Sequence, residues 1–329
     1  MSLRSGVRWV FVIGAWGAAS CGLAFTIPTL VGATVNHVHA ALQLVRPWLG
    51  LLAGLPLLIA ALYRRPVLAV VSGFCVIANV IPVWNAVTSE GVAEANDDAV
   101  TIYVANARYN NATPEILADQ ALTSDADMMI IIELTPQFAE LLQARGVDDL
   151  YPHQVLIPLP DPSGEGIYSR VPLVDEGHQW FGEMQSPFAS IQFGTQELRV
   201  IAAHTYAPNQ QWGLDRWTQS LESLDGYLNE TDLGPTVVAG DFNAARWHPA
   251  FRRLLSGSFE DAHELVGKGL TPSWPTGGGL TGRLLGRFGP FVRIDHALVR
   301  DAGVVDVVDL PAAGSDHLPF MVTIAPDPA

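Results

Sequence analysis

Cysteine and lysine are almost absent from this 329-residue chain. Both cysteines, Cys21 and Cys75, lie in the first quarter of the sequence, and Lys268 is its single lysine. The chain after residue 75 therefore contains neither a disulfide framework nor a zinc site built from cysteine. Because proteins usually bind phosphate backbones through lysine and arginine, the shortage of basic residues also argues against a broad polyanion-binding surface.

Charged residues are scarce overall and unevenly distributed. Residues 1–90 contain five arginines and one acid, Glu90, whereas residues 91–329 contain 13 basic and 32 acidic residues, a formal charge of −19. Hydrophobic residues make up 49% of the chain and charged residues 16%, which excludes a disordered protein. The composition predicts an apolar, slightly basic front joined to an acidic body, in a length that suits one large domain or two ordinary ones.

The front contains three long apolar runs. We predict a membrane anchor over residues 1–84, with transmembrane helices at about 9–30, 44–63 and 66–84, since a bilayer core needs roughly 20 apolar helical residues. One alternative is a signal peptide followed by buried helices, but signal peptides have shorter apolar stretches. A second is processing at Cys21, because residues 18–21 loosely resemble a lipoprotein cleavage site, although the apolar run continues past it.

The arginines of the front predict its orientation. Arg4 and Arg8 precede the first run, and Arg64 and Arg65 separate the second from the third, while Arg46 is the one dissenting charge. Positive short loops stay in the cytoplasm. We therefore expect a multi-pass protein of the cell membrane with a cytoplasmic N-terminus, a linker over residues 85–98, and a body outside the cytoplasm.

From residue 99 onward, short β-rich runs alternate with helical patterns, which predicts an α/β (α+β) body over residues 99–325. Many of these apolar runs end in a polar residue. Each such residue alone is compatible with an ordinary turn, but together they predict one site at a sheet rim. The residues are Asn106, Glu133, His204, Asp241, Asn243, Asp295, His296, Asp316 and His317.

These motifs resemble the endonuclease/exonuclease/phosphatase superfamily, which includes DNase I-like nucleases. The most specific elements are Gly240-Asp241-Phe242-Asn243 and Ser315-Asp316-His317-Leu318-Pro319, and the resemblance covers roughly residues 99–325. The front resembles that of membrane-anchored bacterial members. The resemblance implies a four-layer sandwich, with two packed mixed β-sheets flanked by helices, and metal-assisted hydrolysis of phosphoesters by water.

The resemblance also implies a role for each residue. Glu133 is expected to be the main metal ligand, with Asn106 close by and Asp316 as a further carboxylate on the metal side. These are oxygen donors, which suit Mg²⁺, with Mn²⁺ as the alternative.

The remaining residues are expected to act on the substrate and the attacking water. Asp241 would orient and deprotonate the water, and Asn243 would hold a phosphoryl oxygen or part of the metal's shell. His317, oriented by Asp295, and His204 would contact the phosphate. Arg170 would either contact the substrate or form a structural ion pair.

The expected function is a membrane-anchored, divalent-metal-dependent phosphoesterase with nuclease-like chemistry, acting on a diester or a monoester. Its substrate would be a nucleic acid, for which six arginines offer a local basic patch, or a lipid-linked phosphate or phospholipid of the cell envelope. A further alternative is an inactive membrane-bound binding module. The six arginines are Arg246, Arg252, Arg253, Arg283, Arg287 and Arg293.

Overall fold

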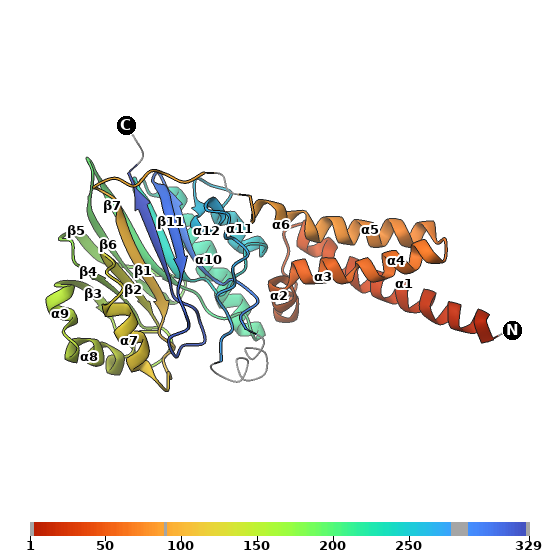
Figure 1. The fold of residues 1–329 in the computed structure, drawn as a ribbon, viewed down its shortest axis with the longest axis horizontal. Coiled ribbons are helices and arrows are strands. Elements are labelled where there is room, and N and C mark those ends of the chain that lie inside the picture. The colour runs from red at the N-terminus through yellow and green to blue at the C-terminus, as the bar shows by residue number, and fades with distance from the viewer. Residues whose placement is uncertain (1–2, 89–90, 278–288, 327–329) are drawn as a thin grey trace.

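The front of the chain is helical and the body alternates strands with helices. The computed structural model describes residues 3–88, 91–277 and 289–326 (Figure 1), so Arg283, Arg287 and part of the predicted linker lie outside the described residues. The front helices are α1 (Leu3–Leu30), α2 (His37–Leu44), α3 (Arg46–Leu52), α4 (Gly54–Leu62), α5 (Pro66–Val80) and α6 (Pro82–Asn85).

Two of the front segments, Val7–Leu30 and Pro66–Trp84, are helices long and apolar enough to cross a bilayer. The predicted second span, over residues 44–63, is not one continuous helix, because the segment is divided into α3 and α4. In its place, α2 and the segment Arg46–Leu62 form a helix pair bent by 78°. Pro47 lies in the first turn of α3, where its ring clashes with any helix continuing from α2.

The body contains two six-stranded sheets. Their orders are β11-β12-β1-β2-β4-β3 and β5-β6-β7-β8-β10-β9. Within them, β1 pairs with β2 and β7 with β8 in parallel, and the other neighbours are antiparallel. The sheets are therefore mixed, as predicted. The strands are β1 (Val100–Asn106), β2 (Met128–Ile132), β3 (His153–Ile157), β4 (Glu165–Ser169), β5 (Leu173–Phe181), β6 (Met184–Phe193), β7 (Gln196–His204), β8 (Thr236–Asp241), β9 (Glu260–Asp261), β10 (Asp295–Arg300), β11 (Gly303–Asp309) and β12 (Phe320–Ala325).

Alternation along these strands builds three apolar layers. One face of each sheet packs on the other sheet, through residues such as Ile130 and Val237. The opposite faces pack on helices, the first sheet on Leu117 and Phe138, and the second on Trp217. This arrangement confirms the predicted four-layer sandwich. The body helices are α7 (Pro114–Leu122), α8 (Pro136–Ala144), α9 (Val147–Leu150), α10 (Gln211–Glu230), α11 (Pro249–Leu254) and α12 (Ala262–Leu265).

The two parallel strand pairs end at the same rim of the sandwich. Asn106 is the last residue of β1, and Glu133 directly follows β2. In the other sheet, the register places His204 beside Asp241, and Asp241 beside Asp295. The polar residues expected at strand ends are thereby collected from both sheets.

The front docks directly on the body. Ala40 of α2 is fully buried in the same apolar cluster as α10 residues of the body. The indole Nε1 of Trp247 donates to the Leu44 carbonyl (3.1 Å), His248 Nε2 bonds to the Ala40 carbonyl (2.9 Å), and Arg246 donates to the Pro82 carbonyl (2.8 Å). Front and body are thus joined by side-chain contacts as well as by the connecting chain.

Candidate active site

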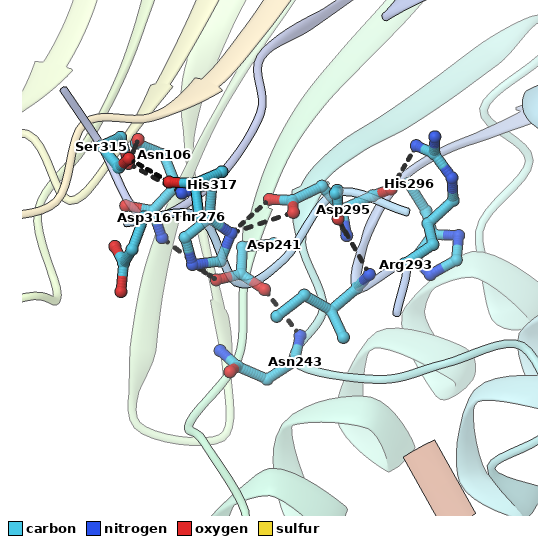
Figure 2. Close-up of polar contacts among 12 residues, drawn as sticks. Asn106, Asp241, Asn243, Thr276, Arg293, Asp295, His296, Ser315, Asp316 and His317 are labelled. Atoms are coloured by element: carbon cyan, nitrogen blue, oxygen red, sulfur yellow. Dashed lines mark hydrogen bonds and ion pairs between the residues drawn. The ribbon is translucent and has the colours of Figure 1, made fainter. Parts of the chain in front are cut away.

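A buried imidazole between two carboxylates forms the centre of the rim. His317 Nδ1 donates to Asp295, lying 2.9 Å from Oδ2 and 3.1 Å from Oδ1. On its other side, His317 Nε2 lies 3.7 Å from Oδ2 of Asp241. Figure 2 shows the ring between the two acids. An aspartate–imidazole pair of this kind fixes the orientation and tautomer of the ring and stabilises its protonated form.

Asp241 is held in place by its neighbours. The backbone N–H of Asn243 donates to its Oδ1 (2.8 Å), and the Asn106 amide donates to its Oδ2 (3.0 Å). The side chain of Asn243 donates in turn to the Thr205 carbonyl (2.8 Å). Asp241 is therefore an oriented carboxylate with a defined rotamer.

The backbone around these residues adopts restricted conformations. Gly240 has φ 149°, and a Cβ there would collide with the Ala203 carbonyl of the neighbouring strand. Glu133 and Asn243 have left-handed backbones, with φ values of 58° and 48°. Non-glycine residues adopt such angles at a cost, and they concentrate at functional sites.

Glu133 lies on the open side of the rim. Its Oε1 accepts from the Asn106 amide (3.1 Å) and its Oε2 from the Tyr109 N–H (2.8 Å). The side chain is half-buried and lines a cavity of about 260 Å³ together with Arg108 and Tyr109. Asn106 thus bridges Glu133 in one sheet to Asp241 in the other.

The Ser-Asp-His segment is fastened to β1. The Ser315 hydroxyl donates to the Asn106 carbonyl (2.7 Å) and accepts from the His317 N–H (3.2 Å). The intervening Asp316 side chain points away from His317 (Figure 2) and lies 3.7 Å from Arg108 Nε, half-exposed. The backbone therefore presents Asp316 and His317 to different sides of the rim.

His204 joins the cluster and Arg170 does not. His204 is buried, with Nε2 3.9 Å from Asp241 Oδ2, and among the described residues its Nδ1 has no hydrogen-bond partner. Arg170 directly follows β4. The last residue of β4, Ser169, pairs with Met128, which begins β2, whereas Glu133 follows the other end of β2. There Arg170 forms an ion pair with Asp125 (2.7 Å). Of the two roles expected for Arg170, this is the structural ion pair and not the substrate contact.

Burial and charge set the protonation of the cluster. Burial alone would lower the pKa of His317, but the carboxylates of Asp295 and Asp241 outweigh it and raise that pKa well above its ordinary value. Burial raises the pKa of Asp241, with His317 opposing and Asp295 adding to the rise. Burial lowers the pKa of His204. The cluster thus favours a protonated His317 beside a neutral His204.

Two serines hold the cluster in ways that the sequence did not reveal. Ser273 Oγ accepts from the N–H groups of Ile294 (3.1 Å) and Asp295 (3.2 Å), and no local pattern marks it. Ser315 was visible as part of a motif, but its bond to β1 depends on a contact 209 residues away in sequence. His296, beside Asp295, turns away and pairs with Asp261.

Two groups of side chains have donors suited to a cation. Ligand atoms of Asp241, Asp295 and His317 lie within 4.8 Å of one another, but the bond from His317 to Asp295 already occupies those atoms. Glu133 and Asp316 offer partly exposed carboxylates, and Asn106 adds an amide oxygen, which here accepts from the Arg108 N–H (2.8 Å) while its nitrogen donates to Glu133. Hard divalent cations prefer such donors, so this second group fits one better.

The chain belongs to the Endonuclease/Exonuclease/phosphatase family, whose model matches residues 102–317. Members of this family are usually divalent-metal-dependent hydrolases of phosphoester bonds. No curated protein matches the sequence.

Solved structures share the fold at low sequence identity. A humanised D. rerio TDP2 is 16% identical, with a TM-score of 0.56 over 69% of this chain and 99% of that one. D. rerio TDP2 complexed with a single-strand DNA product is 18% identical, with the same TM-score and coverage. A family member from Bacteroides thetaiotaomicron is 16% identical, with a TM-score of 0.54 over 70% of this chain and 95% of that one.

Proposed function

We propose that this protein is a membrane-anchored phosphoesterase that uses a divalent cation, Mg²⁺ or Mn²⁺, to hydrolyse a phosphoester with water. The observation that carries the proposal is the buried triad in which His317 lies between Asp295 and Asp241. A structural ion pair needs one acid for its base, whereas here two acids flank the single imidazole of His317, beside a second buried histidine and the half-buried Glu133.

Asp241 has the properties of a general base. Burial raises its pKa, and a base works best when its pKa approaches the working pH. The donors Asn106 and Asn243 orient its carboxylate without filling both lone pairs of each oxygen. In this proposal Asp241 takes a proton from the attacking water.

His317 and His204 provide the phosphate side of the site. Protonated His317 would donate from Nε2 to a phosphoryl oxygen, while Asp295 fixes the opposite edge of its ring. His204 would add a second imidazole on the same side, since its Nε2 lies 3.9 Å from Oδ2 of Asp241. The half-buried side chain of Asn243 adds an amide at the edge of the same cluster.

Glu133, Asn106 and Asp316 would hold the cation. When bound, it would neutralise charge on the phosphate and stabilise the charge that builds up in the transition state. The cation site and the triad share Asn106, because its amide contacts both Glu133 and Asp241. That shared amide couples cation binding to the orientation of the base.

Asp241→Asn in the full-length chain tests the proposal. We expect kcat/KM to fall by about 10² to 10⁴, the usual contribution of general acid–base catalysis. EDTA should abolish wild-type activity, and Mg²⁺ or Mn²⁺ should restore it. Asp125→Asn, which removes an exposed ion pair at the far end of the sheet, is the matched control. A loss below about tenfold for Asp241→Asn would refute the assigned role.

A lipid-linked phosphoester is the second candidate substrate, beside a nucleic acid. Three arginines of the expected basic patch are neutralised, because Arg246 pairs with Glu264, Arg253 with Glu222, and Arg293 with Asp309. The nucleic-acid candidate draws on the DNA product in the D. rerio TDP2 structure.

A substrate panel with the full-length protein in detergent separates the candidates. DNA and RNA cleavage should fall steeply with salt, while hydrolysis of phospholipids or isoprenoid phosphates should not. Failure of every substrate, with and without Mg²⁺, would favour the inactive binding module.

A further inference from the structure

An apolar cavity of about 340 Å³ lies where the anchor meets the body. Its anchor wall includes Trp48 and Leu51 of α3 and Val83 of α6, and its body wall includes Leu270 and Phe291. In Figure 1 this junction is the narrow region between α3, α6 and the body. The cavity is therefore built jointly by the two halves of the molecule.

The anchor wall of the cavity is continuous with the exposed apolar surface of the front. Leu51 is 60% exposed and Trp48 55% exposed, and Trp84, next to Val83, is 70% exposed. Tryptophan concentrates at the level where hydrocarbon meets lipid headgroups. If the front spans a bilayer, these residues would lie at the membrane surface, beside the cavity.

The polar residues of the cavity already have partners. Arg246 binds Glu264 and the Pro82 carbonyl, and Arg293 binds Asp309 at 2.6 Å. No free charge from these two arginines is left to select a phosphate headgroup. The rest of the lining is apolar and would therefore bind an apolar ligand. An apolar cavity of about 150 Å³ is already large enough to bind benzene.

We propose that this cavity binds a hydrocarbon chain of a bilayer lipid. The inference rests on the membrane anchoring proposed above, but not on catalysis. A chain that enters from the adjacent bilayer would cover the apolar walls of the cavity against water, and it would thereby stabilise the docked arrangement of anchor and body.

The position of the cavity links this lipid to the catalytic rim. The body wall includes Ala245 and Arg246, two and three residues after Asn243. It also includes Arg293 and His296, which flank Asp295. A bound chain would therefore brace the two segments that carry the base and the partner of His317.

Photo-crosslinking tests the proposal. The full-length protein is placed in nanodiscs of phosphatidylcholine that carries a diazirine on one acyl chain, and cross-linked peptides are mapped by mass spectrometry. We expect cross-links to the body segments around Leu270 and Phe291. Leu51→Trp, which fills the cavity, should reduce them at least about fivefold.

Leu55→Trp is the matched control, because Leu55 is also a leucine of the anchor, 59% exposed, and does not line the cavity. It should leave the body cross-links unchanged. Leu270→Trp fills the same cavity from the body side and should also reduce the cross-links at Phe291. Agreement between the two variants would show that the loss of cross-links does not come from misfolding of one of them. Equal body cross-linking in Leu51→Trp and Leu55→Trp, or none in the wild type, would overturn the proposal.

Carbonate extraction of the same membranes keeps the two proposals distinguishable. A protein released by carbonate is not anchored, and both proposals then fail. A protein that stays in the membrane but shows cross-links only between two copies would have a second chain, and not a lipid, at this cavity.

Discussion

Glu165 is a carboxyl group buried between the two sheets that the proposed chemistry does not use. It is fully buried, and among the described residues its carboxyl group has one hydrogen-bond partner, the Ser186 hydroxyl at 3.3 Å. Burial raises its pKa well above the ordinary value, although Ser186 opposes the shift. Since its pKa is higher when the protein is folded, the acid's contribution to stability is complete below about pH 4 and is lost as the pH rises toward the folded value.

Glu165→Gln should therefore stabilise the protein increasingly as the pH rises. Relative to the wild type, the gain in unfolding free energy grows by up to about 1.4 kcal/mol per pH unit between about pH 5 and the raised pKa. Thermal unfolding of both full-length proteins in detergent at pH 5 and pH 8 measures it. Glu140→Gln, at an exposed position of α8, should change the unfolding free energy between pH 5 and pH 8 by as much as the wild type does. If Glu165→Gln also shows the same change as the wild type, Glu165 is not protonated in the folded protein.

The sequence located the residues of the rim better than their partners. Chain order places Asn106, Glu133 and Asp241 at the ends of apolar strands, and such ends lie at one rim when the strands are parallel. Their side-chain bonds cross between sheets, as in the contact from Asn106 to Asp241 at 3.0 Å, and no local pattern encodes such a contact. Arg170 failed to reach the rim because β4 runs antiparallel to β2, which sends its C-terminal end the other way.

At the scale of elements, buried strands were easier to predict than edge strands. All five residues of β2 are buried and apolar, so its sequence indicates a strand directly. The sequence of β5 does not, because this strand lies at a sheet edge and exposes residues such as Glu176 and His178 less regularly than a half-buried strand would. The second span was predicted as one helix because hydropathy does not record the interruption at Ala53 between α3 and α4.

Helix α2 is one of the elements that join the front helices to the body. Its Ala40 is fully buried against α10, whereas the next residue, Ala41, is exposed. Ala40→Leu adds volume to a packed contact and should cost about 1 to 3 kcal/mol, lower the thermal midpoint, and reduce phosphoesterase activity as the body loses its support.

Ala41→Leu carries the same substitution one position along the helix and should change neither property. Thermal unfolding and the hydrolysis rate of the full-length variants provide the comparison. If both variants behave like the wild type, α2 only rests on the body and does not stabilise it.

At the scale of the whole molecule, the course of the front restricts how it crosses a bilayer. The N-terminal part of α1 lies beside the turn between α4 and α5, because Arg65 stacks on the Trp9 ring at 4.9 Å. Figure 1 shows this end far from the body, while Ala40 and Pro82 both contact the body. The chain therefore travels from the body end to the far end over residues 46–62 and returns along α5.

If α1 and α5 cross the membrane, the segment from Arg46 to Leu62 must cross it as well. At 1.5 Å per residue it measures about 26 Å, slightly less than a hydrocarbon core of about 30 Å. Local thinning of the bilayer accommodates such a mismatch at small cost. Arg46, at the start of this segment, is buried and donates to Asn79 and to the Ala78 carbonyl. Three crossings would place the body on the opposite side of the membrane from the N-terminus.

Reporters fused to the C-terminus of the full-length chain test this topology. With Arg4, Arg8, Arg64 and Arg65 held in the cytoplasm, an alkaline phosphatase fusion should be active and a green fluorescent protein fusion dark. A reporter fused before residue 1 should give the opposite pattern, which makes the two ends of one chain each other's control. Cytoplasmic signals from both ends would mean that the bent segment does not cross, and the acidic body would then meet its substrate inside the cell.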